Sequence, residues 1–176
     1  MLMRIDTPSL ADYPVRSVEK LRYADTDRQG HISNAVFAVC CQNARMELLC
    51  DQKRVPLPPN VQFAIAKLVL EFRAEMHWPG EVEVGTRVVR IGSSSVVLTQ
   101  ALYVGESCVA VSDSTVVLMD ATTRRSTPLP PQTVQALNGL ARPAQGRMRA
   151  LAELSLRAPK LRAAAKRAMK VVGLGM

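Results

Sequence analysis

Residues 62–121 read QFAIAKLVLEFRAEMHWPGEVEVGTRVVRIGSSSVVLTQALYVGESCVAVSDSTVVLMDA, a stretch rich in β-branched and apolar residues. The breaks WPG, GSSS and GES divide it, and Gly and Ser at such breaks favour tight antiparallel turns. We therefore predict strands over residues 62–76, 81–91, 96–104 and 108–121. Because the links are short, they exclude parallel crossovers, and the four strands are expected to form an antiparallel meander.

A further strand and a helix precede this stretch. Residues 15–24, VRSVEKLRYA, alternate as a strand does, and residues 35–52, AVFAVCCQNARMELLCDQ, carry apolar side chains over most of a helix surface. A helix of this kind is buried rather than laid on a surface. Asn34 is the expected N-cap, and the prolines of residues 54–60 end the helix. The pattern predicts an α+β fold: a five-stranded antiparallel sheet with one long helix inserted after the first strand.

The charge of the chain is concentrated at its C-terminal end. The 176 residues correspond to one domain, and 48% hydrophobic residues exclude a disordered chain. Residues 1–140 hold 14 basic and 14 acidic residues, whereas residues 141–176 hold nine basic residues and one acid, which accounts for the net charge of +8. A short helix is expected from residue 131. We predict a neutral domain over residues 1–140 and a basic amphipathic helical extension over residues 141–176.

The apolar runs, the N-terminal residues and the cysteines and histidines restrict the class of protein. No apolar run reaches the roughly 18 residues of a membrane span, and the N-terminal residues lack the apolar core of a signal peptide, so a cytoplasmic protein is expected. The chain's cysteines and histidines are Cys40, Cys41, Cys50, Cys108, His31 and His77. They form no CxxC pair, and adjacent cysteines on a helix point to different sides, which does not build a tetrahedral zinc site. The three cysteines on the predicted helix, Cys40, Cys41 and Cys50, are expected to behave as small buried hydrophobes. No metal or prosthetic group is expected.

The segment that combines an acid, an imidazole, an amide and a helix start is residues 25–34, DTDRQGHISN. It is not a calcium loop of the EF-hand type, because Val36 occupies the position of the bidentate Glu and Gln29 occupies position 5. No phosphate-binding loop or second acidic cluster accompanies it for magnesium-dependent phosphoryl transfer. One interpretation left open is an N-capping turn whose carboxylates favour the positive helix end. The other is a catalytic site.

The order of these features resembles the hotdog-fold acyl-CoA thioesterases of the 4-hydroxybenzoyl-CoA thioesterase type. A strand, the pattern D-x-x-G-H-x-x-N, a long buried helix with Ala44-Arg45 and the following strands carry the resemblance over about residues 15–140. Arg90-Ile91-Gly92, Ser94-Ser95 and residues 116–120 before a PLP close are similar as well. The resemblance implies a sheet wrapped around the helix, a homodimer or homotetramer, and hydrolysis of an acyl thioester at the subunit interface.

The resemblance also implies a catalytic pair. The family's catalytic carboxylate falls on Asp27, three residues before Gly30, and its carbonyl-polarising backbone N–H falls near Asn34. The physical chemistry agrees, because a helix N-terminus offers unsatisfied N–H groups and partial positive charge where an oxyanion develops. Whether Asp27 is the nucleophile or the general base stays open.

Further residues are expected to bind substrate: Gly30, His31, Phe37, Arg90 and Ser94. The chain departs from many relatives at Gln42, where a helix Glu is common, and Asp25 is expected to be solvated or to end the strand. The substrate is acyl-CoA or an acyl carrier protein, and an aliphatic acyl chain is favoured because aromatic residues are few.

Two other functions stay open, a non-catalytic acyl-CoA-binding protein and a hotdog hydratase in which His77 beside Trp78 would act. The basic extension is expected to be a solvated helix, or to contact an anionic membrane surface, an acyl carrier protein or a neighbouring subunit. Nucleic acid is a less favoured partner, because the extension has no aromatic residue for stacking.

Overall fold

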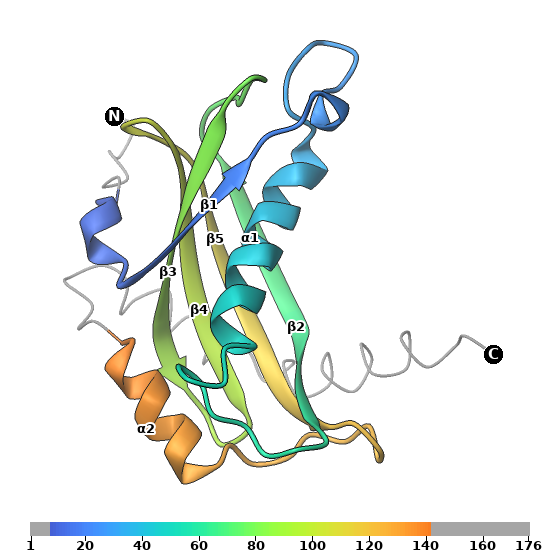
Figure 1. Ribbon diagram of the computed structural model, residues 1–176, viewed down its shortest axis with the longest axis vertical. Coiled ribbons are helices and arrows are strands. Elements are labelled where there is room, and N and C mark those ends of the chain that lie inside the picture. The colour runs from blue at the N-terminus through green and yellow to red at the C-terminus, as the bar shows by residue number, and fades with distance from the viewer. Residues whose placement is uncertain (1–7, 142–176) are drawn as a thin grey trace, which may run out of the picture.

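The framework of the molecule is a five-stranded antiparallel sheet curved around one long helix (Figure 1). The computed structural model describes residues 8–141. Its elements are η1 (Leu10–Asp12), β1 (Val15–Lys20), η2 (Tyr23–Asp25), α1 (Asn34–Leu49), β2 (Val61–Phe72), β3 (Glu81–Ile91), β4 (Ser95–Val104), β5 (Ser107–Asp120) and α2 (Pro131–Gly139). The fold expected from the sequence, a five-stranded antiparallel sheet wrapped around a long helix, is confirmed.

The order of strands across the sheet is β1-β3-β4-β5-β2, and every neighbouring pair is antiparallel. β3, β4 and β5 follow one another as hairpins. β2, however, pairs with β5 at the edge farthest from β1, so the prediction of a four-strand meander is wrong at β2. The reason is the link of residues 73–80, which is no tight turn. It pairs with the loop before α1, where the Ile32 N–H donates to the Met76 carbonyl at 2.8 Å.

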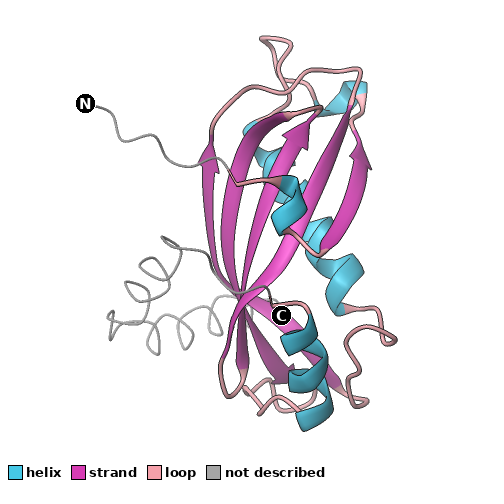
Figure 2. Cartoon of the chain, turned by 90° about the vertical axis from the view of Figure 1, so that its left-hand side faces the viewer, coloured by secondary structure: helices cyan, strands magenta, loops and turns pink. Residues whose placement is uncertain are grey.

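α1 lies against the inner face of the sheet (Figures 1 and 2). Its buried side chains are Phe37, Cys40, Cys41, Ala44, Arg45, Leu48 and Leu49. Cys40 and Cys41 are buried as predicted, whereas the prediction is wrong for Cys50, which is exposed because it follows the last helical residue. Cys108 of β5 is buried as well. Burial raises the pKa of the Cys40 thiol to about 12, so this thiol stays protonated and packs as a small apolar group.

Several element ends differ from the prediction. Asn34 is the first helical residue and Ser33 occupies the N-cap position, so the assignment of Asn34 as N-cap is wrong. β1 ends at Lys20 because the next residues turn into η2, and α1 ends at Leu49 rather than at residue 52. β2 ends at Phe72, after which the N–H groups of residues 73 and 74 both donate to the carbonyl of Val109.

A buried polar network ties α1 to the sheet. Gln100 of β4 is 0% exposed and accepts a hydrogen bond from Arg45 Nη1 at 2.9 Å. Its Nε2 donates to the Cys41 carbonyl at 3.0 Å and to Thr86 Oγ1 at 3.1 Å. Burial lowers the pKa of Arg45, which has no carboxylate partner among residues 8–141. Gln100 is therefore the residue that satisfies a buried cation.

α2 lies at the end of the sheet away from the start of α1 (Figure 1). Its Leu137 is fully buried in a cluster with Leu48 and Leu49 of α1. The predicted basic extension falls, from residue 142 on, outside the described residues, and the division of the chain at residue 140 stays a prediction. Within residues 8–141, neither α-helix has the length and apolar character needed to cross a membrane.

Candidate functional site

The loop between β1 and α1 is closed by the side chain of Asp27. Asp27 Oδ1 accepts hydrogen bonds from the N–H groups of Gln29 at 2.8 Å and His31 at 3.2 Å. The Asp27 N–H donates to the His31 carbonyl at 2.7 Å, and Gly30 supplies the positive φ of 81° that the tight turn requires. Asp27 is exposed, and its Oδ2 has no hydrogen-bond partner within residues 8–141. One carboxylate oxygen holds the loop and the other faces solvent.

Asp25 anchors the same loop from inside. It is only 7% exposed and accepts hydrogen bonds from the backbone N–H of Arg22 at 2.8 Å and from Arg22 Nη2 at 2.6 Å. The side-chain hydrogen bond with Arg22 lowers the pKa of Asp25 below its ordinary value. The expectation that Asp25 is solvated is therefore wrong, because the turn of η2 folds its carboxylate back onto Arg22. Asp25 is a structural residue of the loop.

The first turn of α1 has N–H groups without acceptors. The Ser33 N–H donates to the Asp25 carbonyl and the Val36 N–H donates to the Ser33 carbonyl, each at 2.9 Å. Among the residues that the structure describes, the backbone N–H groups of Asn34 and Ala35 have no hydrogen-bond acceptor. A helix N-terminus also carries partial positive charge. Two donors are therefore available for an anion or a developing oxyanion.

A cleft of about 590 Å³ joins this loop to the helix start. Its lining residues are Asp27, Gln29, His31, Ile32, Asn34, Phe37, Phe72, Arg73, Ala74 and Glu75. The cleft thus brings together four residues expected from the sequence, namely Asp27, His31, Asn34 and Phe37. The Phe37 ring meets Phe72 of β2 edge to face, with centroids 5.1 Å apart. The cleft has apolar and polar walls, which suits a substrate with both kinds of surface.

Two expected binding residues lie elsewhere. Arg90 is near the end of β3, where it pairs with Val97, and Ser94 is in the turn that follows. That turn is at the end of the sheet opposite the Asp27 loop (Figure 1). Within one chain, Arg90 and Ser94 are therefore not part of the cleft, and their role in substrate binding stays a prediction. Gly30 shapes the loop but does not line the cleft.

Sequence analysis missed the contribution of the link after β2. Arg73, Ala74 and Glu75 line the cleft, and Glu75 Oε2 lies 3.4 Å from His31 Nε2. These residues stand more than 40 positions after Asp27, so only the crossing of the chain from β2 to β3 brings them near. The available signal was the run Glu75-Met76-His77, an acid and an imidazole directly after a strand.

A second groove, about 320 Å³ in volume, lies in the seam between α1 and β2 and shares no lining residue with the cleft. Its lining residues are Ala38, Val39, Gln42, Arg45, Ile65, Ala66, Lys67 and Leu68. Val39 is 47% exposed and Ile65 is 48% exposed, so this seam presents apolar surface to solvent. The edge strand β2 adds Val69 and Phe72, each 47% exposed.

Comparisons with known proteins identify one protein family and several similar solved structures. The family model of the thioesterase-like superfamily matches residues 21–137. No curated protein is similar enough to the chain to count as a match. A solved structure of a thioesterase from Thermus thermophilus, complexed with coenzyme A and Zn, has 26% sequence identity and a TM-score of 0.66, over 75% of this chain and 98% of that one.

Two further solved structures share the fold. A protein of Pseudomonas aeruginosa strain PAO1 has 23% identity and a TM-score of 0.71, over 78% of this chain and 99% of that one. A 1,4-dihydroxy-2-naphthoyl-CoA thioesterase from Synechocystis has 18% identity and a TM-score of 0.62, over 73% and 98% of the two chains. The matched region contains the whole sheet except β1, together with α1 and the Asp27 loop.

Proposed function

Because the chain belongs to the thioesterase-like superfamily, we propose that it hydrolyses an acyl thioester to a carboxylic acid and a free thiol. The observation that carries the proposal is one cleft lined by the Asp27 carboxylate and by the start of α1, with its unbonded N–H groups. Thioester hydrolysis needs a carboxylate that activates or replaces water and a donor where the oxyanion develops. Asp27 serves as the carboxylate and the Asn34 N–H as the donor.

The reaction follows from these two groups. Asp27 acts either as the base that deprotonates water or as the nucleophile that attacks the carbonyl carbon. In both routes the negative charge on the carbonyl oxygen is stabilised by the N–H groups at the start of α1. When Asp27 acts as the base, the C–S bond breaks, the thiolate takes up the proton that came from water, and the carboxylic acid leaves. When Asp27 acts as the nucleophile, C–S cleavage leaves a mixed anhydride on Asp27, which water hydrolyses to the carboxylic acid and the free carboxylate while the thiolate takes up a proton.

We propose that the substrate is an acyl-CoA. The alternative is an acyl group carried as a thioester by an acyl carrier protein. The coenzyme A bound by the similar Thermus thermophilus thioesterase supports the first. The groove between α1 and β2 supports an aliphatic acyl chain, because Val39, Ile65 and Leu68 line it. Lys67 in that groove supplies positive charge for an anionic substrate, whereas Arg73 in the cleft is paired with Glu71 at 3.2 Å.

A second copy of the chain completes the site in this proposal. Within residues 8–141, β2 pairs with β5 on one side only, so it is an edge strand, and it exposes Ile65, Leu68, Val69 and Phe72. A hydrophobic edge strand of this length is a template for pairing with another chain. Pairing of β2 between two copies covers the α1–β2 groove and gives a homodimer, or a homotetramer of such pairs.

The test is thiol release from a panel of short, long and aromatic acyl-CoAs by the wild type and by Asp27→Asn. The Asn side-chain carbonyl still accepts the N–H bonds of Gln29 and His31, so the loop stays closed while the carboxylate is lost. We expect turnover to fall about 10²–10⁴-fold with an unchanged melting temperature. Asp120→Asn is the matched control, because Asp120 Oδ1 accepts two backbone N–H bonds in the same manner at the other end of the sheet.

The hydrogen-bond donor at the start of α1, the Asn34 N–H, can be removed without changing Asp27. Proline is tolerated at the first helical position and lacks an N–H, so Asn34→Pro deletes one donor with little change of structure. Ser33, with φ −55° and ψ 139°, already has the extended conformation that precedes proline. We expect a loss of about 10²–10³-fold in turnover for Asn34→Pro, and full turnover for Asn34→Ala, which keeps the N–H.

Other outcomes contradict the proposal. Saturable acyl-CoA binding without turnover by the wild type would identify a non-catalytic binding protein. Conversion of an enoyl substrate without thiol release would identify a hydratase. Full turnover by Asp27→Asn would exclude this carboxylate from the chemistry.

A further inference from the structure

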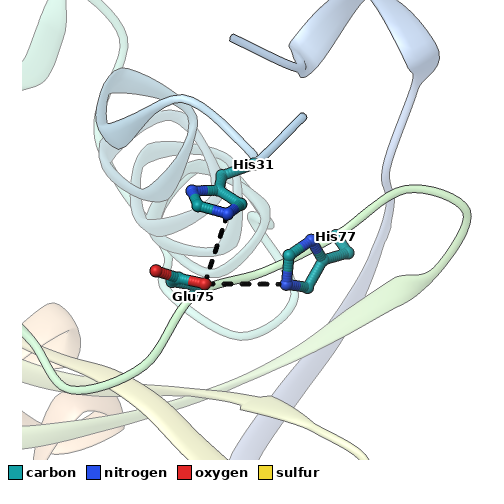
Figure 3. Close-up of side chains that lie close together, drawn as sticks. All are labelled: His31, Glu75 and His77. Atoms are coloured by element: carbon teal, nitrogen blue, oxygen red, sulfur yellow. Dashed lines mark ion pairs between the residues drawn. The ribbon is translucent and has the colours of Figure 1, made fainter. Parts of the chain in front are cut away.

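We propose that His31, Glu75 and His77 form a binding site for a divalent transition-metal ion of the zinc type. The chain contains two histidines, 46 positions apart, and the fold brings both to one carboxylate (Figure 3). Glu75 Oε2 lies 3.4 Å from His31 Nε2 and 3.8 Å from His77 Nε2. No other group of this kind is found among residues 8–141.

The backbone fixes the two segments that carry the ligands. His31 in the loop before α1 and His77 in the link after β2 form an antiparallel bridge, which the 2.8 Å hydrogen bond from Ile32 N–H to the Met76 carbonyl reinforces. The imidazole rings stand nearly perpendicular, at 81°, with centroids 5.1 Å apart. The rings therefore do not stack, and Figure 3 shows the Nε2 atom of each ring directed at the same carboxylate oxygen.

One of the three ligand distances already fits a tetrahedral ion, and the other two are slightly longer. Zinc bound at about 2.0–2.1 Å requires ligand atoms roughly 3.3–3.4 Å apart. The three ligand atoms lie within 4.8 Å of one another, and one pair is already at 3.4 Å. Because the Glu75 and His77 side chains are 65% and 61% exposed, small rotations close the other two distances without disturbing the core.

The donor set selects the class of metal. Two imidazoles and one carboxylate are the ligands of open zinc sites, which keep a fourth position for water or another ligand. Nitrogen donors favour zinc, copper, nickel and cobalt over magnesium and calcium. A plain ion-pair cluster is the competing explanation, and ion pairs this exposed contribute little to stability.

The site adjoins the proposed catalytic loop without sharing its carboxylate. His31 and Glu75 line the same cleft as Asp27, and the His31 N–H donates to Asp27 Oδ1. A bound ion therefore stands at the cleft wall and adds positive charge there. Its binding is measured without substrate, so this inference and the proposed hydrolysis fail or succeed independently.

The experiment is calorimetric titration of the full chain, prepared without a histidine tag, with ZnCl₂. Cys50→Ser serves as the background, because Cys50 is the exposed thiol among the described residues. We expect one ion per chain, and at least about tenfold weaker binding in His77→Ala and in Glu75→Gln. Glu106→Gln, an exposed carboxylate in the β4–β5 turn, is the matched control and should bind as the background does.

Cobalt gives an independent readout, because a four-coordinate Co²⁺ centre absorbs visible light far more strongly, and at longer wavelength, than the six-coordinate aquated ion. His77→Ala carries the test, since the His77 side chain is 61% exposed and its loss leaves the fold intact. Absence of saturable Zn²⁺ binding, or binding that is unchanged in His77→Ala, would overturn the proposal.

Discussion

Replacement of the buried Gln100 by Leu tests how α1 is held on the sheet. Gln100 makes one hydrogen bond to the charged guanidinium of Arg45 and two to neutral groups of Cys41 and Thr86. A bond to a charged group contributes about 1.5–3 kcal/mol and a neutral one about 0.5–1.5 kcal/mol. The three sum to about 2.5–6 kcal/mol, and since Leu recovers part by its apolar contacts, we expect a loss of about 3 kcal/mol of unfolding free energy.

The assay is urea unfolding of Gln100→Leu, Arg45→Met and the double variant. We expect a lower midpoint with an unchanged slope for Gln100→Leu. Arg45→Met removes the buried cation that donates a hydrogen bond to Gln100. The unfolding free energy lost in the double variant should therefore be at least about 1 kcal/mol smaller than the sum of the two single losses. A loss below about 0.5 kcal/mol for Gln100→Leu, or strict additivity in the cycle, would refute the reasoning.

Three further predictions concern the loop, the sheet and its edge. The pKa of Asp25 is depressed in the folded state below its ordinary value of 3.8, so its carboxylate stabilises the fold above that pH and the contribution is lost as the pH falls through the depressed value. Urea midpoints of the wild type should therefore fall more steeply below about pH 4 than those of Asp25→Asn, and parallel curves would contradict this. Gly85→Ala should cost about 1–3 kcal/mol in urea unfolding, because a Cβ there would lie 2.6 Å from the buried Tyr13 ring; an unchanged midpoint would argue against that packing. Val69→Lys on β2 should convert the proposed oligomer to monomers in sedimentation, whereas Val18→Lys on the opposite edge strand, at a residue 60% exposed, should leave it intact; equal behaviour of the two variants would rule out β2 as the interface.

The sequence predicts the strands of this protein better than it predicts their neighbours. The breaks WPG and GSSS on either side of residues 81–91 give the bounds of β3 without error, because turn residues end a strand. The pattern within a strand carries no information on which strand lies beside it. β2 could not be placed next to β5 from the sequence, since that pairing depends on where the link of residues 73–80 crosses the molecule.

The residues of the candidate site also fall into two groups: those that the local sequence predicts and those that only the fold brings together. Asp27, His31 and Asn34 are close in the sequence, so a turn before a helix was enough to group them. The partnership of Glu75 and His77 with His31 depends on a contact between segments far apart in the chain, which local patterns do not record. The expectation for Asp25 is wrong for a different reason. A carboxylate next to a strand end is usually solvated, whereas the backbone turn of η2 buries the Asp25 carboxylate against Arg22.

The bridge between the loop before α1 and the link after β2 has a kinetic consequence. Contacts between segments far apart in the chain form late in folding, because the entropy of closing the intervening chain must first be overcome. The cleft is therefore expected to assemble after the β3–β4–β5 hairpins and to open before the whole sheet unfolds. The amide of Ile32, 3% exposed and bonded across this bridge, reports that opening. Its hydrogen exchange, compared with that of amides in β4, measures the integrity of the cleft without any substrate.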